Sequence, residues 1–196
     1  MAMVTWVRLA KGTVAGALLL CAGATAPAGA QGAFVLNSPD VHAGARFASA
    51  QIFNGMGCTG GNVSPALVWR AAPAATRSFA VTSYDPDAPT WSGWWHWVVF
   101  NIPASTTSIP MGAGDVKKKL MPKGAIQSRT DFGTDGYGGP CPPQGDKPHH
   151  YIFTVYAVDE DKLQFAKDHN VSAAVVGFEL HFHSKAKASL TATYGR

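Results

Sequence analysis

The sequence is dominated by three long runs in which β-branched and aromatic residues are concentrated. They cover Ser78–Tyr84, Trp95–Ile102 and His150–Val158. Side chains of this kind pack well on the pleated surface of a sheet, so each run predicts a β-strand. Shorter runs of similar character predict further strands at Phe34–Leu36, Leu67–Arg70, Ile126–Arg129 and Ser189–Tyr194.

Glycine and proline separate these runs. With 21 glycines and 13 prolines among 196 residues, the chain favours many short elements joined by turns. The regular alternation of strand and helix that builds a parallel α/β sheet is missing. A helix is predicted only at Ala173–Ser184, with Ser172 as its N-cap. At most one further helical turn is predicted, at Asp159–His169. We therefore expect a mainly β fold, a β-sandwich with one or two short peripheral helices.

The first thirty residues, 1–30, have the pattern of a secretory signal peptide. Two basic residues precede the apolar run Val14–Ala22, and the small residues Ala28–Ala30 fit a signal-peptidase site. We expect cleavage near Ala30, which leaves 31–196 as one periplasmic or secreted domain. A buried N-terminal helix is the alternative. The apolar run is short for a bilayer and no other segment is long enough, so no transmembrane anchor is expected.

The charge of the chain gives little support for nucleic acid binding. Only 14% of the residues are charged, and the formal net charge of +4 includes two basic residues of the predicted leader. The one basic run, Lys117–Lys119, lies in a predicted loop, where exposure to solvent accounts for it. Nucleic acid binding requires a broader basic surface, so no nucleic acid partner is expected.

Export changes how the cysteines are interpreted. Cys21 is removed with the predicted leader, which leaves Cys58 and Cys141. An oxidising compartment favours the pairing of an even number of cysteines. Both residues lie in glycine-rich segments that are typical of loops. We predict a disulfide between Cys58 and Cys141, with two buried free thiols as the alternative.

Polar side chains gather where predicted strands begin or end. The segments are Asp85–Pro89, Gly93–Trp97 and Asp131–Tyr151, and binding sites are commonly built on loops that a rigid sheet holds in place. Each segment also has a plainer interpretation. Asp85 or Asp87 can cap a turn, and a histidine between tryptophans can be a hydrogen-bonded core residue.

The length and order of these motifs resemble the phosphatidylethanolamine-binding protein family, and within it the bacterial Raf-kinase-inhibitor-like branch. The motifs are SYDPDAP (Ser83–Pro89), GWWHWVVFNIP (Gly93–Pro103), and GYGGPCPP followed by PHHYIFTVYAVD (Gly136–Asp159). The similarity extends from about Phe34 to Arg196. It implies a β-sandwich with a small anion-binding pocket, which agrees with the strands predicted above.

The resemblance also implies which residues form that pocket. They are the paired acids of DPDAP, the histidine after the tryptophans, the loop GPC and two positions of HHY: Asp85, Asp87, His96, Gly139, Pro140, Cys141, His149 and Tyr151. His150 stands where the family usually has arginine. Because neighbouring residues of a strand point to opposite faces, we expect His150 to lie outside the pocket.

These residue types suit a phosphate-bearing small molecule or a phospholipid headgroup. Imidazole and phenol groups and the backbone N–H groups of Gly138–Cys141 can donate hydrogen bonds to an anion. The Asp85 carboxylate would repel the anion unless it accepts a hydrogen bond from a histidine, which would also fix the histidine tautomer. We therefore expect anion binding to strengthen as the pH falls through the range in which histidine titrates.

Two alternatives are an enzyme and a protein inhibitor. Acids, histidines and a tyrosine in one pocket would fit a hydrolase or a metal-dependent enzyme. The sequence contains neither a GxSxG elbow nor a GK[ST] phosphate-binding loop, so we predict no catalysis and no cofactor. The resemblance also implies that a protein partner, such as a serine protease, could be inhibited through the surface of the protein.

A metal site is a further alternative. His181 and His183 form an H-x-H motif. On a strand the two rings would share one face, but on the predicted helix they diverge. Zinc sites need at least three protein ligands, and the sequence indicates no third one. We therefore expect no metal site.

Overall fold

The computed structural model describes Met1, Met3 and residues 32–163 and 171–196. Apart from Met1 and Met3, the predicted signal peptide lies outside the described residues, and so does most of the helical turn expected at Asp159–His169. The described part of that segment, residues 159–163, is not helical. The described residues from 32 onward belong to one compact unit.

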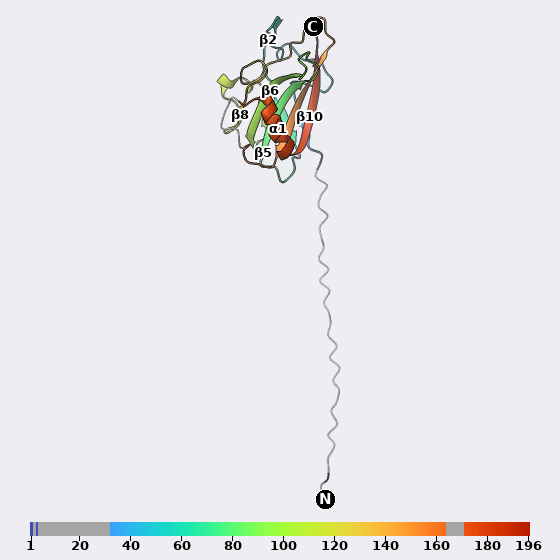
Figure 1. Cartoon of the computed structure of the whole chain (residues 1–196), viewed down its shortest axis with the longest axis vertical. Coiled ribbons are helices and arrows are strands. Elements are labelled where there is room, and N and C mark those ends of the chain that lie inside the picture. The colour runs from blue at the N-terminus through green and yellow to red at the C-terminus, as the bar shows by residue number, and fades with distance from the viewer. Residues whose placement is uncertain (2, 4–31, 164–170) are drawn as a thin grey trace. The chain divides into compact units, whose positions relative to one another are not determined.

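A five-stranded antiparallel sheet forms the centre of the fold, with its strands in the spatial order β10, β9, β5, β6, β8 (Figure 1). Strand β5 (Ser78–Asp85) lies between β9 (His149–Val158) and β6 (Trp94–Pro103). The three strands predicted from the longest apolar runs are therefore neighbours. Strands β8 (Ile126–Gln127) and β10 (Ser184–Tyr194) form the two edges.

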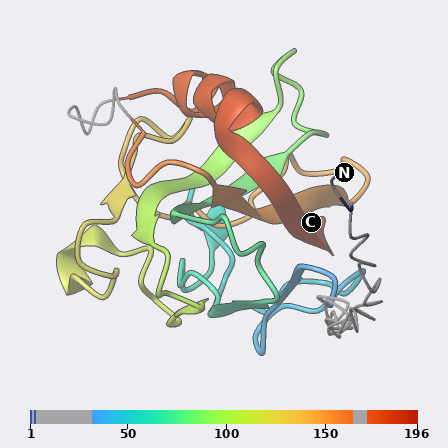
Figure 2. The same ribbon diagram turned by 90° about the horizontal axis from the view of Figure 1, so that it is seen from below.

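A smaller sheet and one α-helix cover the two faces of the large sheet, as Figure 2 shows. The smaller sheet contains β1 (Val35–Asn37), β4 (Leu67–Arg70) and β7 (Ser108–Ile109). The helix α1 (Ala173–His183) starts after Ser172, whose hydroxyl oxygen accepts a hydrogen bond from the Val175 N–H. The remaining elements are a hairpin of β2 (Asn54–Gly55) and β3 (Cys58–Thr59), and the short 3-10 helix η1 (Val116–Lys118). The predicted mainly β fold is confirmed.

The long strands are apolar at consecutive positions because both of their faces are buried. In β5, Phe79 and Val81 point into the core between the sheets, whereas Ala80 lies in a second cluster with Val176 and Leu180 of α1. Burial of apolar area on both sides of the strand is favourable in proportion to that area. The same arrangement explains the uninterrupted hydrophobicity of β6 and β9.

Two elements differ from the expectation. Strand β10 begins at Ser184, five residues before the predicted start at Ser189. Its first part alternates exposed lysines with small alanines (Lys185, Ala186, Lys187, Ala188), and alanine gives only a weak strand signal. The glycine-rich segment around Cys58, which is typical of a loop, contributes instead to the β2–β3 hairpin.

Cys58 and Cys141 form the predicted disulfide. It joins the β2–β3 hairpin to the glycine-rich loop before β9 and closes a span of 83 residues. Among the described residues, no helix combines the length and the apolar character needed to cross a bilayer.

Removal of the disulfide should destabilise the fold. The bond restricts a long loop in the unfolded chain, so the Cys58→Ser/Cys141→Ser double variant should lose about 2–5 kcal/mol of unfolding free energy. Urea unfolding of both proteins measures this. A reductant should lower the midpoint of the wild type to that of the variant and leave the variant unchanged, and equal midpoints without reductant would contradict the prediction.

Candidate ligand-binding site

A cavity of about 260 Å³ lies at the end of the large sheet where β5 ends and where β6 and β9 begin. Polar and apolar side chains share its wall. The polar ones are Asp85, Thr90, Trp94, His96, His149, Tyr151 and Arg196, and the others are Met56, Ala88, Pro89, Phe132, Cys141, Pro142 and Pro143.

A buried carboxylate–imidazole pair forms part of the wall. Asp85 and His149 are each 2% exposed, and Asp85 Oδ2 lies 2.8 Å from His149 Nδ1. The other carboxylate oxygen, Oδ1, accepts the Asp87 N–H at 2.8 Å. Asp85 therefore caps a turn and also orients a histidine. The second ring nitrogen of His149, Nε2, lies 3.4 Å from Asp146 Oδ2, so each nitrogen of this ring faces a carboxylate.

His96 is buried and neutral at pH 7. Its Nδ1 lies 2.7 Å from the carbonyl oxygen of Gly138. A carbonyl can only accept, so Nδ1 carries the proton and Nε2 of the neutral ring is an acceptor. Burial lowers the pKa of His96 to about 4. Contrary to expectation, His96 does not become a charged donor in the usual range of histidine.

Two buried donors at the cavity have no hydrogen-bond partner among the described residues. They are the hydroxyl of Tyr151 and Nε1 of Trp94. Tyr151 is 1% exposed, and its ring packs edge-on against His96 with 5.0 Å between the ring centroids. Burial, followed by the negative charge of Asp85, raises the pKa of Tyr151, and the hydroxyl approaches the Asp85 carboxylate without forming a hydrogen bond of regular geometry. Its hydroxyl therefore remains protonated and available as a donor.

The structure brings five of the eight implied residues to the cavity wall: Asp85, His96, Cys141, His149 and Tyr151. Asp87 does not line the cavity. Its Oδ2 accepts hydrogen bonds from the N–H and the Nδ1 of His150, at 2.8 and 2.7 Å. His150 is exposed, as the alternation of strand residues predicts.

Gly139 and Pro140 support the cavity wall without lining it. A Cβ at Gly139 would lie 2.1 Å from the carbonyl oxygen of Gln51, so only glycine fits there. Its N–H donates to Asn62 Oδ1 at 2.8 Å, and the carbonyl of Pro140 accepts the Phe53 N–H at 3.1 Å.

The backbone donors expected from this loop are therefore partly engaged by the protein itself. The Gly138 N–H donates to the carbonyl oxygen of His96 at 2.8 Å, and proline has no N–H to offer. This loop consequently positions Cys141 at the cavity. Its residues Gly138, Gly139 and Pro140 supply no free N–H group to a ligand.

Arg196 is a cavity residue that the sequence analysis did not find. Its guanidinium donates to three carbonyl oxygens, those of Pro142 (2.6 Å), Gly57 (3.0 Å) and Met56 (3.3 Å). These carbonyls belong to the two segments that the disulfide joins. No local motif marks Arg196, because its place in the wall depends on the tertiary fold. Phe132, by contrast, lies within a segment that the sequence analysis selected.

The three tryptophans of the GWWHW motif have different roles. Trp94 lines the cavity. Trp95 packs against Tyr84 with 4.4 Å between the ring centroids. Trp97 is fully buried, and its Nε1 donates to Gln127 Oε1 at 2.7 Å. Core packing thus accounts for Trp97.

The H-x-H motif lies on α1, as predicted, and His183 belongs to an ion-pair network. Ligand atoms of Asp159, Glu160 and His183 lie within 4.8 Å of one another. However, the Lys185 ammonium lies 2.5 Å from Asp159 Oδ2 and lowers the pKa of Asp159. A cation is therefore already supplied by the protein, and this cluster is better explained by ion pairing than by metal binding.

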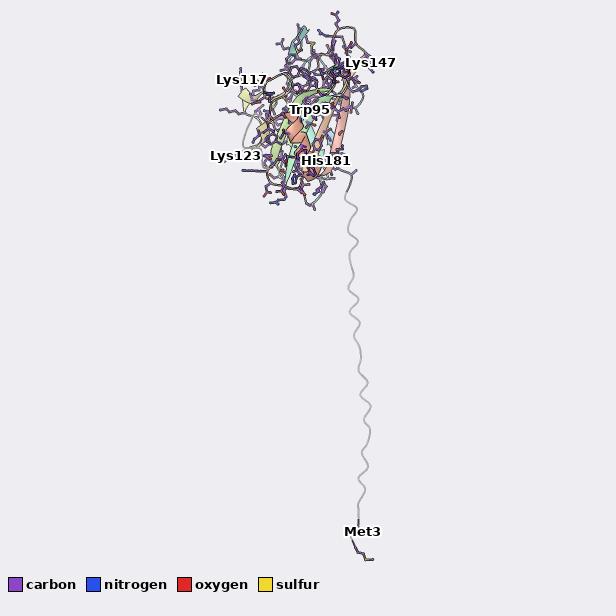
Figure 3. All side chains as sticks on the ribbon, viewed as in Figure 1. Met3, Trp95, Lys117, Lys123, Lys147 and His181 are labelled. Carbon is purple, nitrogen blue, oxygen red and sulfur yellow. A yellow bond between two sulfur atoms is a disulfide. The ribbon has the colours of Figure 1, made fainter. Side chains whose placement is uncertain are left out.

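Lysines are dispersed over the domain. Figure 3 shows Lys117 and Lys123 on one side of the domain and Lys147 on the other.

Comparison with known families and proteins identifies the relatives of this chain. Residues 37–195 match the family model described as phosphatidylethanolamine-binding protein. The chain is 49% identical to the protein YbcL of Escherichia coli over 162 residues, which are 83% of this chain and 87% of YbcL. It is 52% identical to YbhB of the same organism over 159 residues, 81% of this chain and 98% of YbhB.

Solved structures give the same result. The crystal structure of E. coli YbcL, described as a new member of the mammalian PEBP family, matches with a TM-score of 0.81 and 48% identity, over 83% of this chain and 98% of that one. The structure of CT736 from Chlamydia trachomatis, described as a putative homologue, matches with a TM-score of 0.69 and 27% identity, over 84% and 98%.

The neutrality of His96 predicts a specific dependence of stability on pH. Because the pKa of His96 is about 4 in the fold and about 6.5 in the unfolded chain, the unfolded state binds the proton first as the pH falls. The contribution of the neutral His96 ring to the unfolding free energy is complete above pH 6.5 and is lost as the pH falls toward 4. Between pH 7.5 and pH 5 the loss should be about 2 kcal/mol.

Urea unfolding of the wild type and of His96→Gln across this range measures the loss. Glutamine does not titrate, so the stability of the wild type should fall by this amount relative to the variant. Parallel pH profiles for the two proteins would mean that His96 is not held neutral.

Proposed function

The chain belongs to the phosphatidylethanolamine-binding protein family, and from the chemistry of its cavity we propose that it is an exported, non-catalytic protein that binds a small phosphate-bearing ligand. The family description itself refers to binding of a phospholipid. The hydrogen-bond donors and acceptors of the cavity wall restrict the chemical class of the ligand.

The observation that carries the proposal is the pair of buried donors without a partner, the Tyr151 hydroxyl and Trp94 Nε1. A buried donor left unpaired costs about 1–3 kcal/mol, and an anionic oxygen would satisfy it. Arg196 adds a positive charge to the same wall. Its guanidinium binds backbone carbonyls and forms no ion pair with a carboxylate of the described residues, so its charge is left to act on a ligand.

The ligand should combine the phosphate with a hydrogen-bond donor. His96 Nε2 and the Asp85 carboxylate are acceptors, and Asp85 would repel a fully ionised phosphate. Two kinds of ligand supply the required donor. One is a singly protonated phosphomonoester, and the other is a phosphodiester with an ammonium group, as in an ethanolamine headgroup.

Binding without catalysis is supported by the state of the nucleophile candidates in the cavity wall. Cys141 is held in the disulfide. The Thr90 hydroxyl donates to the Gly93 carbonyl, and the Tyr151 hydroxyl stays protonated because its pKa is raised. The Asp85–His149 pair resembles part of a catalytic triad, but His149 Nε2 faces Asp146 and not a hydroxyl group. This arrangement does not activate a nucleophile.

Export is supported by the leader pattern of residues 1–30 and by the disulfide, which persists in oxidising compartments. N-terminal sequencing of the protein from its native compartment tests this part of the proposal. A mature chain that begins near Gln31 is expected, and a mature chain that begins at Met1 would contradict export.

Modulation or inhibition of a protein partner, such as a protease, is a second candidate function. The observation that favours it is the solvent-facing side of α1, where Phe178 and Phe182 are 62% and 58% exposed. Large exposed apolar side chains that lie together often mark interaction surfaces, and these two rings pack against each other at 5.0 Å.

The variants Tyr151→Phe and Tyr137→Phe should have opposite effects on ligand affinity and on stability. Loss of the unpaired Tyr151 hydroxyl should leave stability unchanged or raised, and should weaken binding of phenyl phosphate about tenfold or more. The Tyr137 hydroxyl donates to the Gln51 carbonyl at 3.1 Å and lies outside the cavity wall. Its loss should lower stability by about 1 kcal/mol and leave affinity unchanged.

Calorimetry and urea unfolding of the two variants separate these effects. Equal affinity in the wild type and Tyr151→Phe would contradict the site, and weakened affinity in Tyr137→Phe would show that the effect is not specific to the cavity.

The requirement for a donor in the ligand predicts discrimination between two headgroups. The two compounds share the same glycerol hydroxyls and phosphodiester, so they differ only at the headgroup nitrogen. Glycerophosphoethanolamine offers N–H donors there to His96 Nε2 and Asp85, whereas the quaternary nitrogen of glycerophosphocholine offers none. The first should bind about tenfold or more tightly than the second. Calorimetric titration at pH 7 measures both, and equal affinities would exclude the proposed role of the acceptors.

A further inference from the structure

Strand β10 forms one edge of the large sheet, and a neighbouring segment covers the last part of that edge. The Thr193 N–H donates to the Ala45 carbonyl at 2.8 Å, and the Thr193 carbonyl accepts the Phe47 N–H at 3.0 Å. The Thr191 carbonyl accepts the Gly44 N–H at 2.8 Å. The edge is therefore closed at Thr191 and Thr193.

The edge is open nearer to the start of β10. The register with β9 is regular from Ala186 to Tyr194, and in an antiparallel pair every second residue directs both of its backbone groups away from the partner strand. Lys187 and Ser189 consequently face outward, as Thr191 does. Among the described residues, no neighbouring segment forms a backbone hydrogen bond to these two positions.

A groove of about 410 Å³ lies beside the open edge, between α1 and the sheet. Its wall contains Gly177 and His181 of α1, Tyr156 of β9, and Lys185 and Lys187 of β10. Both lysines are exposed. Positive charge thus lies next to backbone groups that can still pair with a further strand.

The charges at this edge favour an acidic partner over a second copy of the chain. Lys185 Nζ lies 2.5 Å from Asp159 Oδ2, whereas no carboxylate of the described residues forms an ion pair with Lys187. Lysines on an edge strand commonly oppose pairing between identical edges. Two β10 edges paired here in antiparallel would place lysines opposite one another, which is unfavourable. An acidic strand would be attracted instead.

We propose that the open edge of β10 at Lys187 and Ser189 binds an extended acidic segment of a protein partner as an additional strand. Backbone hydrogen bonds would supply affinity, and acidic side chains on the side of α1 would pair with Lys187 and select the partner. The inference rests on the second candidate function, the modulation of a protein partner, and it is independent of the ligand proposed for the cavity.

Calorimetric titration with a short peptide tests the proposal on the purified protein. The peptide is blocked at both ends and carries glutamate at every second position, with valine and threonine between. Lys187→Glu should bind it about fivefold or more weakly than the wild type, because an attractive cross-strand pair becomes a repulsive one. Equal affinity in the two proteins would overturn the edge site.

Lys117→Glu is the matched control, because it changes the net charge by the same amount. Lys117 lies on η1, and Figure 3 shows it well apart from His181 of the groove. Peptide affinity should be unchanged in this variant. Equal weakening by Lys117→Glu and Lys187→Glu would assign the effect to net charge alone and would also overturn the edge site.

Amide hydrogen exchange shows whether the peptide adds a strand. At saturating peptide, exchange of the Lys187 and Ser189 N–H groups should slow about tenfold or more, because a hydrogen-bonded amide exchanges only after local opening. A peptide with lysine in place of glutamate should protect neither group. Binding of the acidic peptide without this protection would contradict strand addition.

Two further comparisons separate the inference from the proposed functions. Phenyl phosphate should bind Lys187→Glu as it binds the wild type, since Lys187 lies outside the cavity wall. If the peptide bound and phenyl phosphate did not, the cavity proposal would fail and the edge site would stand. If Phe178→Ser weakened peptide binding and Lys187→Glu did not, the partner surface would be on α1, so the second candidate function would stand and the edge site would be wrong.

A second copy of the chain is the alternative occupant of the edge. Sedimentation velocity and hydrogen exchange of the wild type without peptide detect it. The Lys187 and Ser189 N–H groups should then exchange without protection. A dimer in which these two groups are protected would assign the edge to self-association and overturn the proposal.

Discussion

The Asp85 carboxylate lies at the end of β5 with 2% of its surface exposed, and both of its oxygens accept hydrogen bonds. A charged group so deeply buried is tolerated only when it is paired and hydrogen-bonded. Here the partners are the Asp87 N–H and His149 Nδ1, which belong to the turn after β5 and to the start of β9. The carboxylate therefore fixes two segments of the cavity wall relative to each other. Under the proposed function it also favours a ligand that brings a donor as well as a phosphate.

Another part of the cavity wall, formed by the segments around Cys58 and Cys141, is held by two links of different chemistry. The disulfide joins Cys58 to Cys141, and the Arg196 guanidinium binds carbonyls of the same two segments. These two links keep this part of the cavity wall in place.

The sequence predicts the fold well because burial on both faces of the large sheet leaves long apolar runs, as in β6 and β9. It predicts α1 because Ser172 caps a segment of helical character. The strand β10 is underestimated, since its alanines are buried beside lysines and carry a weak signal. Of the eight pocket residues that the family resemblance implies, five line the cavity. The two acids of DPDAP look equivalent in sequence. Only the structure shows that Asp85 turns inward and Asp87 toward His150.

Other features depend on tertiary contacts that no local pattern encodes. Arg196 reaches Met56 and Gly57 across about 140 residues, and no motif predicts that approach. The neutrality of His96 follows from its burial, and its tautomer follows from the Gly138 carbonyl. The local sequence, a histidine between tryptophans, predicts neither.

The protonation state of His96 and its response to a ligand provide the most direct test of the proposed site. Nitrogen NMR of its ring at pH 7, without and with saturating glycerophosphoethanolamine, reports the tautomer and the state of Nε2. We predict a neutral ring with the proton on Nδ1 and an Nε2 resonance that moves when the ligand is added. A protonated ring, or an Nε2 resonance that the ligand does not affect, would contradict the account.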